Sequence, residues 1–160
     1  MFLWFLGCSF AAVWLVFRSP ALDHRLVMAG AVLPLAELLA GRPWVLHTLV
    51  GATAAMALVM AATHRRRLLR RRWLGIPVGL YAHLVLDGTW TDKNLFWWPF
   101  FGWGFTDRSL PEIRPWPLVV VLELAGLAAL WWMIRTFDLT EPSRRDDFLH
   151  TGRLGRDLVA

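Results

Sequence analysis

The sequence predicts an all-α polytopic membrane protein with about five transmembrane helices. Its 160 residues are 57% hydrophobic and 18% charged, whereas soluble domains carry about 45–50% apolar and about 25% charged residues. Eleven tryptophans and ten phenylalanines accompany a single tyrosine, and Trp at this density is typical of chains that anchor at membrane–water interfaces. The single cysteine, Cys8, excludes an internal disulfide framework and a cysteine-based zinc site.

Five apolar stretches predict the individual helices, because a span needs roughly 20 apolar residues. In chain order they are Met1–Phe17, Leu26–Ala40, Trp44–Ala62, Trp73–Leu86 and Trp116–Ile134. The first is expected to be a retained helix, since no basic residue precedes it and no clear small-residue cleavage site follows. The second and fourth are short, and a re-entrant segment is the alternative for each. Together they predict a helical membrane domain over residues 1–138 and a cytoplasmic tail over residues 139–160.

The placement of arginine predicts the orientation. Six arginines lie between residues 65 and 72, and such basic loops stay in the cytoplasm. With five spans, thirteen Lys and Arg residues fall inside and four outside. The N-terminus is therefore expected outside and the C-terminus inside, in the plasma (inner) membrane of a bacterium. A patch for anionic lipid or DNA is the alternative explanation of the arginine block, although topology alone accounts for it.

The net charge of +5 raises the question of a nucleic-acid partner. The arginines fall between apolar runs rather than along one surface, so we expect membrane lipid as the partner and no nucleic acid.

Four ionisable side chains fall at one depth of this arrangement, near the outer membrane face. They are Glu37, His47, His83 and Asp87. Ionisable groups inside a bilayer are costly and usually mark function. Because they come from three different predicted helices, their agreement in depth predicts a polar site within the bundle.

Small residues line the helices that carry the two histidines. Gly75 and Gly79 precede His83 and Asp87 at four-residue intervals, so all four share one helix face. In the third span, His47 is followed at the same spacing by Gly51 and Ala55. Small residues allow helix backbones to approach closely. Each of these two rows of small residues is therefore expected to bring its histidine to the site.

Two imidazoles and two carboxylates indicate a site for a divalent metal ion, with zinc or manganese expected. Such an ion can lower the pKa of a bound water to about 7 and polarise a carbonyl or phosphoryl oxygen. Asp92, just beyond the fourth span, is predicted to assist as a further ligand, a general base or an orienting partner of a histidine. The alternative is a non-enzymatic scaffold or partner-binding protein, in which the polar groups only lock the helices together.

Two further ionisable residues are expected outside the site. His24 lies thirteen residues before Glu37, hence about 20 Å away along a helix. Glu123 lies seven residues after Trp116, about 10 Å into the fifth span. It is expected to hydrogen-bond within the bundle, and the alternative is that it joins the polar cluster from below.

The run Leu95–Phe105 is almost entirely aromatic and is expected at the headgroup level. It forms either a roof over the polar cluster for a phosphoester or lipid-linked substrate, or an aromatic belt without a specific ligand.

Several motifs resemble one family. Tyr81–Thr89 (YAHLVLDGT), followed by Leu95–Phe100 (LFWWPF), resembles the signature of the YdjM-like inner-membrane metal-dependent hydrolases. Val45–Leu49 and Gly30–Pro34 are similar to two further stretches of that family, in the same order, within about residues 24–101.

The resemblance implies a metal-dependent hydrolase in which His83, Asp87 and His47 occupy metal-site positions and Glu37 stands at a second acid position. This sequence departs from the family at two expected ligand positions, which hold Leu35 and Arg42. The implied ligand set is therefore thinner, and the resemblance carries a reaction class but no substrate.

Overall fold

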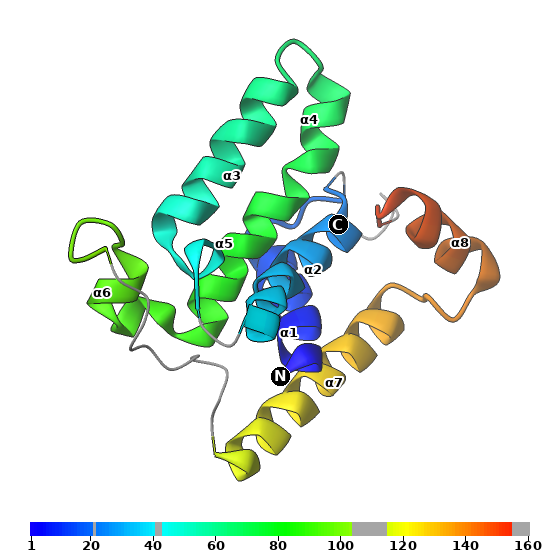
Figure 1. Cartoon of the computed structure of the whole chain (residues 1–160). Helices are drawn as coiled ribbons and strands as arrows, with labels where there is room; N and C mark the ends of the chain where they lie inside the picture. The colour runs from blue at the N-terminus through cyan, green and yellow to red at the C-terminus, as the bar shows by residue number, and fades with distance from the viewer. Residues whose placement is uncertain (21, 41–42, 104–114, 155–160) are drawn as a thin grey trace.

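The computed structural model describes residues 1–20, 22–40, 43–103 and 115–154, and within these ranges the fold is helical (Figure 1). The elements are α1 (Phe2–Phe17), α2 (His24–Val32), η1 (Leu33–Ala40), η2 (Val45–His47), α3 (Leu49–Ala62), α4 (Arg67–Trp73), α5 (Gly75–Asp87), η3 (Thr89–Thr91), α6 (Lys93–Phe96), α7 (Trp116–Thr136) and α8 (Pro142–Thr151), where η marks a 3-10 segment.

The prediction of five transmembrane helices, with the N-terminus outside and the C-terminus inside, is wrong. Among the described residues only α7, with 21 residues, is long and apolar enough to cross a membrane. Helices α1, α3 and α5 have 16, 14 and 13 residues. They reach about 20–24 Å, short of the roughly 30 Å hydrocarbon core of a bilayer. The predicted orientation, and the prediction that the site lies near the outer membrane face, both depended on five spans and are therefore not supported.

Two local breaks explain why the apolar runs overestimated the helices. Pro34 has no amide hydrogen and disfavours a continuing α-helix, and α2 ends at Val32, beyond which the chain continues as η1. In the third run, the Thr48 hydroxyl accepts the Gly51 amide at 2.9 Å, which caps α3 so that it begins only at Leu49. Neither break interrupts the apolar composition.

Helices α1 and α7 run parallel and in close contact (Figure 1). The Leu3 amide donates to Glu123 at 2.7 Å, which confirms that Glu123 hydrogen-bonds within the bundle. Further along the same contact, a Cβ added at Gly7 would overlap the Gly126 carbonyl, and one added at Gly126 would overlap the Leu3 carbonyl. Phe10 then packs against the end of α7. Small residues at the contact permit this close approach.

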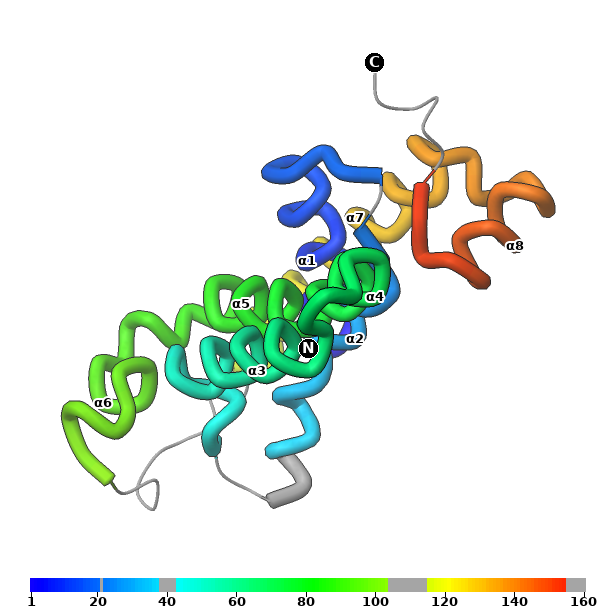
Figure 2. Tube along the Cα trace, turned by 90° about the horizontal axis from the view of Figure 1, so that it is seen from above, coloured from blue at the N-terminus to red at the C-terminus, as the bar shows by residue number. Residues whose placement is uncertain are grey.

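Helices α2 and α5 form a second parallel pair. A Cβ added at Gly79 would overlap the Val27 carbonyl, and one at Gly30 would overlap the Ile76 carbonyl. The expected packing face of α5 is therefore confirmed for its glycines. Figure 2 shows α3 lying along α5, with α6 and α8 on opposite sides of the molecule.

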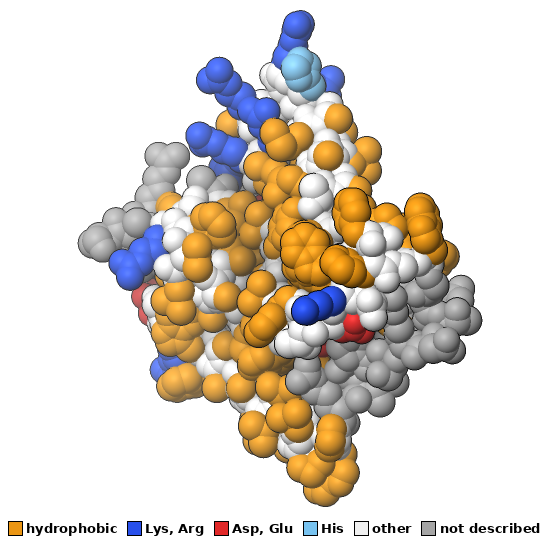
Figure 3. Space-filling model, turned by 90° about the vertical axis from the view of Figure 1, so that its left-hand side faces the viewer, with side chains coloured by type: hydrophobic (Ala, Val, Ile, Leu, Met, Phe, Trp, Pro, Cys, Tyr) orange, Lys and Arg blue, Asp and Glu red, His pale blue; other side chains and the backbone are white. Residues whose placement is uncertain are grey.

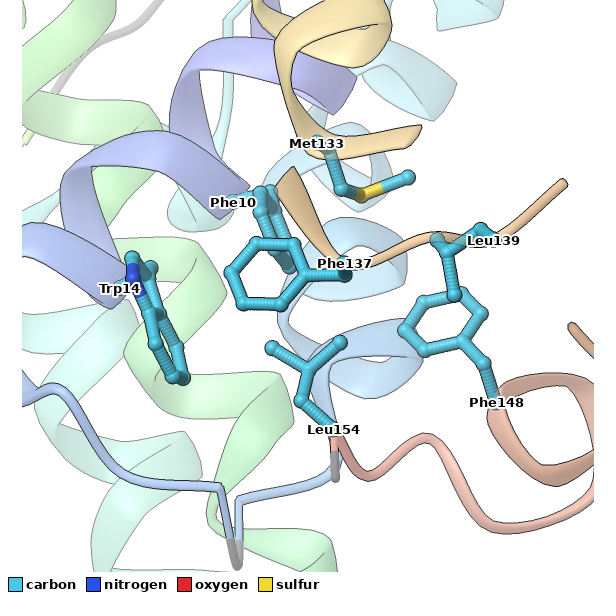
Figure 4. Close-up of a cluster of buried hydrophobic side chains, with 7 residues drawn as sticks. All are labelled: Phe10, Trp14, Met133, Phe137, Leu139, Phe148 and Leu154. Carbon is cyan, nitrogen blue, oxygen red and sulfur yellow. The ribbon is translucent and has the colours of Figure 1, made fainter. Parts of the chain in front are cut away.

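The predicted tail contains α8, which is joined to the helical domain by a hydrophobic core (Figure 4). This core consists of Phe10, Trp14, Met133, Phe137, Leu139, Phe148 and Leu154. Because α8 supplies Phe148 and the residues after it supply Leu154, the tail is packed against α1 and the end of α7.

Helix α7 lies on the surface of the fold. Only 11% of its most apolar 18-residue stretch is buried, and Leu124 and Trp131 are about 60% exposed (59% and 61%). Figure 3 shows another face, where hydrophobic side chains cover much of the surface and arginine side chains gather at the end formed by the α3–α4 turn. An exposed apolar surface of this extent indicates contact with a membrane or another apolar partner.

Candidate metal centre

Three side chains that the sequence placed at one site meet in the structure. His47, His83 and Asp87 each offer one ligand atom, and these atoms lie within 4.8 Å of one another. All three side chains are buried, with exposures of 0%, 0% and 1%. We refer to them as the metal cluster. The structure thus supports a possible metal-binding group without identifying the ion.

Helix α5 contributes two members of the metal cluster. His83 and Asp87 are four residues apart and therefore lie one above the other on the same helix face. Helix α5 ends at Asp87, and Gly88 follows with φ of 75°, a left-handed conformation that favours glycine. The chain consequently turns away just after Asp87, and its carboxylate lies at the end of the helix.

His47 reaches the metal cluster from the short η2 segment, before α3 begins. The prediction that His47, Gly51 and Ala55 share one helix face is therefore wrong for His47. Gly51 nevertheless matters, because a Cβ there would overlap the Val45 carbonyl. Because glycine has no Cβ, the η2 turn can fold back on α3. The His47 and His83 rings then meet edge to face, with their centroids 5.2 Å apart.

A carboxylate and a carbonyl determine the tautomers of the two histidines. Nδ1 of His47 donates to Glu37 Oε2 at 2.6 Å, and Nδ1 of His83 donates to the Ala31 carbonyl at 2.7 Å. Both oxygens are acceptors, so the proton of each neutral ring lies on Nδ1 and the lone pair lies on Nε2. Metal-binding histidines are commonly oriented by such contacts to an oxygen.

Glu37 is held by three hydrogen bonds. Besides His47, it accepts the Trp44 amide at 2.6 Å and the Leu46 amide at 2.9 Å. It is 8% exposed and is not among the three clustered ligands. The structure therefore places Glu37 in contact with the ligand His47, which it orients, and not among the three residues that could bind the metal directly.

Asp87 and His83 have further neighbours that restrict their side chains. The Thr89 hydroxyl donates to Asp87 Oδ2 at 2.9 Å, and the Phe5 ring stacks on the His83 ring with a centroid distance of 4.1 Å. The sequence alone predicts no role for Thr89 or Phe5. Thr89 sits two residues after Asp87, a spacing that could have suggested a local contact, whereas the sequence holds no signal for Phe5.

Asp92, the residue predicted to assist at the metal, caps a helix in the structure. It is exposed, and its Oδ1 accepts the amides of Asn94 and Leu95 at 3.0 and 3.3 Å. These contacts make it the N-cap of α6. The aromatic run predicted as a roof is described only as far as Trp103, and the remainder lies outside the described residues.

Two Nε2 atoms and one carboxylate oxygen match the donor set of catalytic divalent-metal sites. Zinc binds histidine nitrogen and carboxylate oxygen at about 2.0–2.2 Å, and catalytic sites use three protein ligands beside an open position. Ligand atoms within 4.8 Å would need shifts of only about 1 Å to reach those distances. The residues present therefore fit a divalent ion.

No family model, no curated protein and no solved structure matches this chain. The resemblance to the YdjM-like hydrolases therefore stays a prediction.

Proposed function

We propose that this protein is a membrane-embedded metal-dependent hydrolase whose metal is held by His47, His83 and Asp87. The observation that carries the proposal is the buried group of two imidazoles and one carboxylate, with ligand atoms within 4.8 Å. The contacts of Glu37 with His47 and of the Ala31 carbonyl with His83 support it. Both contacts give the tautomer that a metal ligand requires.

The chemistry follows from this donor set. A bound divalent ion such as zinc or manganese supplies a water of lowered pKa and polarises a carbonyl or phosphoryl oxygen. The chain's own residues would hold the ion, through Nε2 of each histidine and the Asp87 carboxylate. Glu37 and Thr89 restrict the side chains of His47 and Asp87.

We place the protein in a bacterial plasma membrane through α7. Its 21 residues measure about 31 Å, the thickness of a hydrocarbon core. Trp116 begins the helix and Arg135 lies in its last turn, residues that suit the two interfaces. Glu123, its one acidic residue, binds the first turn of α1, as expected of an acid within a bundle.

We propose an amphiphilic substrate with an ester or phosphoester bond. A cavity of about 420 Å³ lies beside Glu37, between Ala36 and the residues Trp44–Leu46. A larger apolar groove of about 770 Å³ follows α2 from Arg25 to the same Ala36. An apolar chain in the groove would bring a head group to the cavity beside Glu37, which contacts the ligand His47.

A structural role is the second candidate function. The observation that favours it is the nearly complete burial of the metal cluster, since structural metal sites are closed whereas catalytic ones keep a position for water. In that case the three residues, with or without an ion, would lock η2 to α5 in a scaffold that catalyses nothing.

Metal content tests the proposal first. Detergent-purified wild type should retain near-stoichiometric zinc or manganese by mass spectrometry, and His83→Ala and Asp87→Asn should lose it. The matched controls are His64→Ala and Asp146→Asn, which change exposed residues of the same types. A well-folded wild type that takes up no ion from excess metal would overturn the metal site.

Hydrolysis is then tested on ester and phosphoester substrates that carry long acyl chains. Turnover that requires the bound ion and is lost in His83→Ala supports the hydrolase. A loaded site without turnover on any of these substrates favours the structural candidate. Melting curves in detergent keep loss of the fold separate from loss of activity.

A further inference from the structure

A second polar cavity lies where the start of α2, the helix α4 and the end of α8 meet. It measures about 200 Å³ and is lined by Asp23, Arg72, His150, Thr151 and Arg153. We call it the Asp23 pocket. Asp23 and Gly75 are in contact at the first turn of α5, whereas the metal cluster lies at the other end of that helix. The two sites are thus about 18 Å apart along α5.

Asp23 holds two guanidinium groups in place. Its Oδ1 accepts Arg25 Nε at 3.1 Å, and its Oδ2 accepts Arg25 Nη2 at 3.0 Å. Oδ2 also pairs with Arg72 Nε at 3.3 Å. The carboxylate is 2% exposed, so it acts as a buried anchor. Because Arg72 binds Asp23 through Nε, its terminal Nη groups can donate to a second anion.

The end of α8 is fixed against the same anchor. The His24 amide donates to the Gly152 carbonyl at 2.8 Å. Gly152 has φ of 69°, and a Cβ there would overlap Asp23 Oδ1, so only glycine allows this approach. Arg153 follows directly, between Gly152 and the buried Leu154. Its guanidinium makes no hydrogen bond or ion pair within the described ranges.

The charge of the pocket favours an anion. Arg25, Arg72 and Arg153 surround a single carboxylate, so these four side chains together carry a net charge of +2. Arginine binds phosphate oxygens through paired N–H groups. A volume of about 200 Å³ is several times the roughly 30 Å³ share of a water molecule. It holds a phosphate group but not the rest of a lipid.

We propose that the Asp23 pocket binds the phosphate of an anionic membrane lipid through Arg72 and Arg153. The pocket borders the arginine-rich α4, where Leu68 and Trp73 are also exposed. Leu154, the residue after Arg153, belongs to the core at the end of α7 (Figure 4). Basic clusters beside the end of an apolar helix attract anionic lipid. This site is separate from the metal cluster, and it stands even if no hydrolysis occurs.

The test uses the full-length protein in neutral detergent and measures binding of short-chain phosphatidylglycerol, phosphatidylcholine and glycerol phosphate. Wild type should prefer phosphatidylglycerol to phosphatidylcholine. The double variant Arg72→Gln/Arg153→Gln should weaken that binding at least about tenfold, because two charge-assisted hydrogen-bonding groups are lost. The matched control is Arg144→Gln/Arg145→Gln, which removes the same charge from α8 outside the pocket and should change affinity less than about twofold.

Arg153→Gln alone keeps the test valid if the double variant does not fold, because Arg153 has no partner whose loss would destabilise the described fold. Binding of glycerol phosphate as tight as that of the lipid, and equally sensitive to Arg153→Gln, supports the phosphate site but assigns it to a soluble phosphoester. Equal weakening in the pocket and control variants shows general attraction to charge and overturns the proposal. So does the absence of any binding.

Discussion

Glu37 accepts the Nδ1 proton of His47 at 2.6 Å while binding the amides of Trp44 and Leu46. One carboxylate thus sets both the backbone turn that carries His47 and the tautomer of its ring. The effect on a metal would be indirect, through the orientation of a ligand. Glu37 is therefore a positioning residue, whereas Asp87 is one of the three residues that could bind the metal directly.

Glu37→Gln is expected to weaken metal affinity by about 10–100-fold, the usual effect of removing an orienting partner. Metal titration followed by mass spectrometry measures it. Glutamine keeps the size of the side chain, so the melting temperature should change little compared with the loss of affinity. Glu141→Gln, on the exposed N-cap of α8, is the control. Unchanged affinity in Glu37→Gln would show that His47 does not depend on Glu37.

Protein stability should fall as the pH drops below about 6.5, and His24 should account for part of the loss. Burial lowers the pKa of His24, against weaker opposing effects of the Ser19 carbonyl and Asp23. The folded state therefore keeps the ring neutral, while the unfolded chain takes up a proton below about pH 6.5. Stability from this group is complete above that pH and is lost below it.

The measurement is the melting temperature between pH 7.5 and 5.5 for wild type and His24→Gln. The decrease should be steeper in wild type, because the variant has no ring to protonate. Parallel curves for the two proteins would contradict a role for His24. His64→Gln, on an exposed turn, controls for the loss of a histidine.

Gly126→Leu should destabilise the contact between α1 and α7. The new side chain would overlap Leu3 and Trp4 of α1, and overpacking typically costs about 1–3 kcal/mol. The matched substitution is Ala128→Leu, on the exposed side of the same helix, and should be nearly neutral. Thermal or denaturant unfolding compares them, and equal effects would argue against the parallel packing of α1 and α7.

Membrane association should depend on α7. Leu124→Arg/Leu127→Arg places two charges on its exposed apolar face, at about 2.5–3.5 kcal/mol each for a residue near the centre of a span. The variant should lose resistance to alkaline carbonate extraction, which wild type is expected to show. Leu149→Arg, on the polar helix α8, should remain resistant. Extraction of wild type under the same conditions would count against an embedded α7.

Part of the site could be predicted because it follows from local spacing. His83 and Asp87 are one helical turn apart, and Gly75 and Gly79 continue the same face, so their common direction needs no tertiary information. The grouping with His47 was also correct, although the spans used to derive it were not. The grouping depends only on which end of each apolar run carries the polar residue. The helix breaks at Pro34 and Thr48 do not change that.

The remaining features depend on tertiary contacts that a linear pattern does not contain. Pro34 and the capping hydroxyl of Thr48 shorten two helices within uninterrupted apolar sequence. Phe5 reaches His83 from a helix 78 positions earlier in the chain, and Asp23 meets Arg72 across 49 positions. Hydropathy reports that such residues are apolar or charged, but it does not report their partners.

The two histidines differ in what secures them, and this difference has a consequence for inherited variation. The partner of His83 is a main-chain carbonyl, which every residue type at position 31 possesses. The partner of His47 is a side chain that a single codon change can remove. Substitutions at Glu37 can therefore change the orientation of His47 in small steps. The orientation of His83 changes only if the backbone at Ala31 moves.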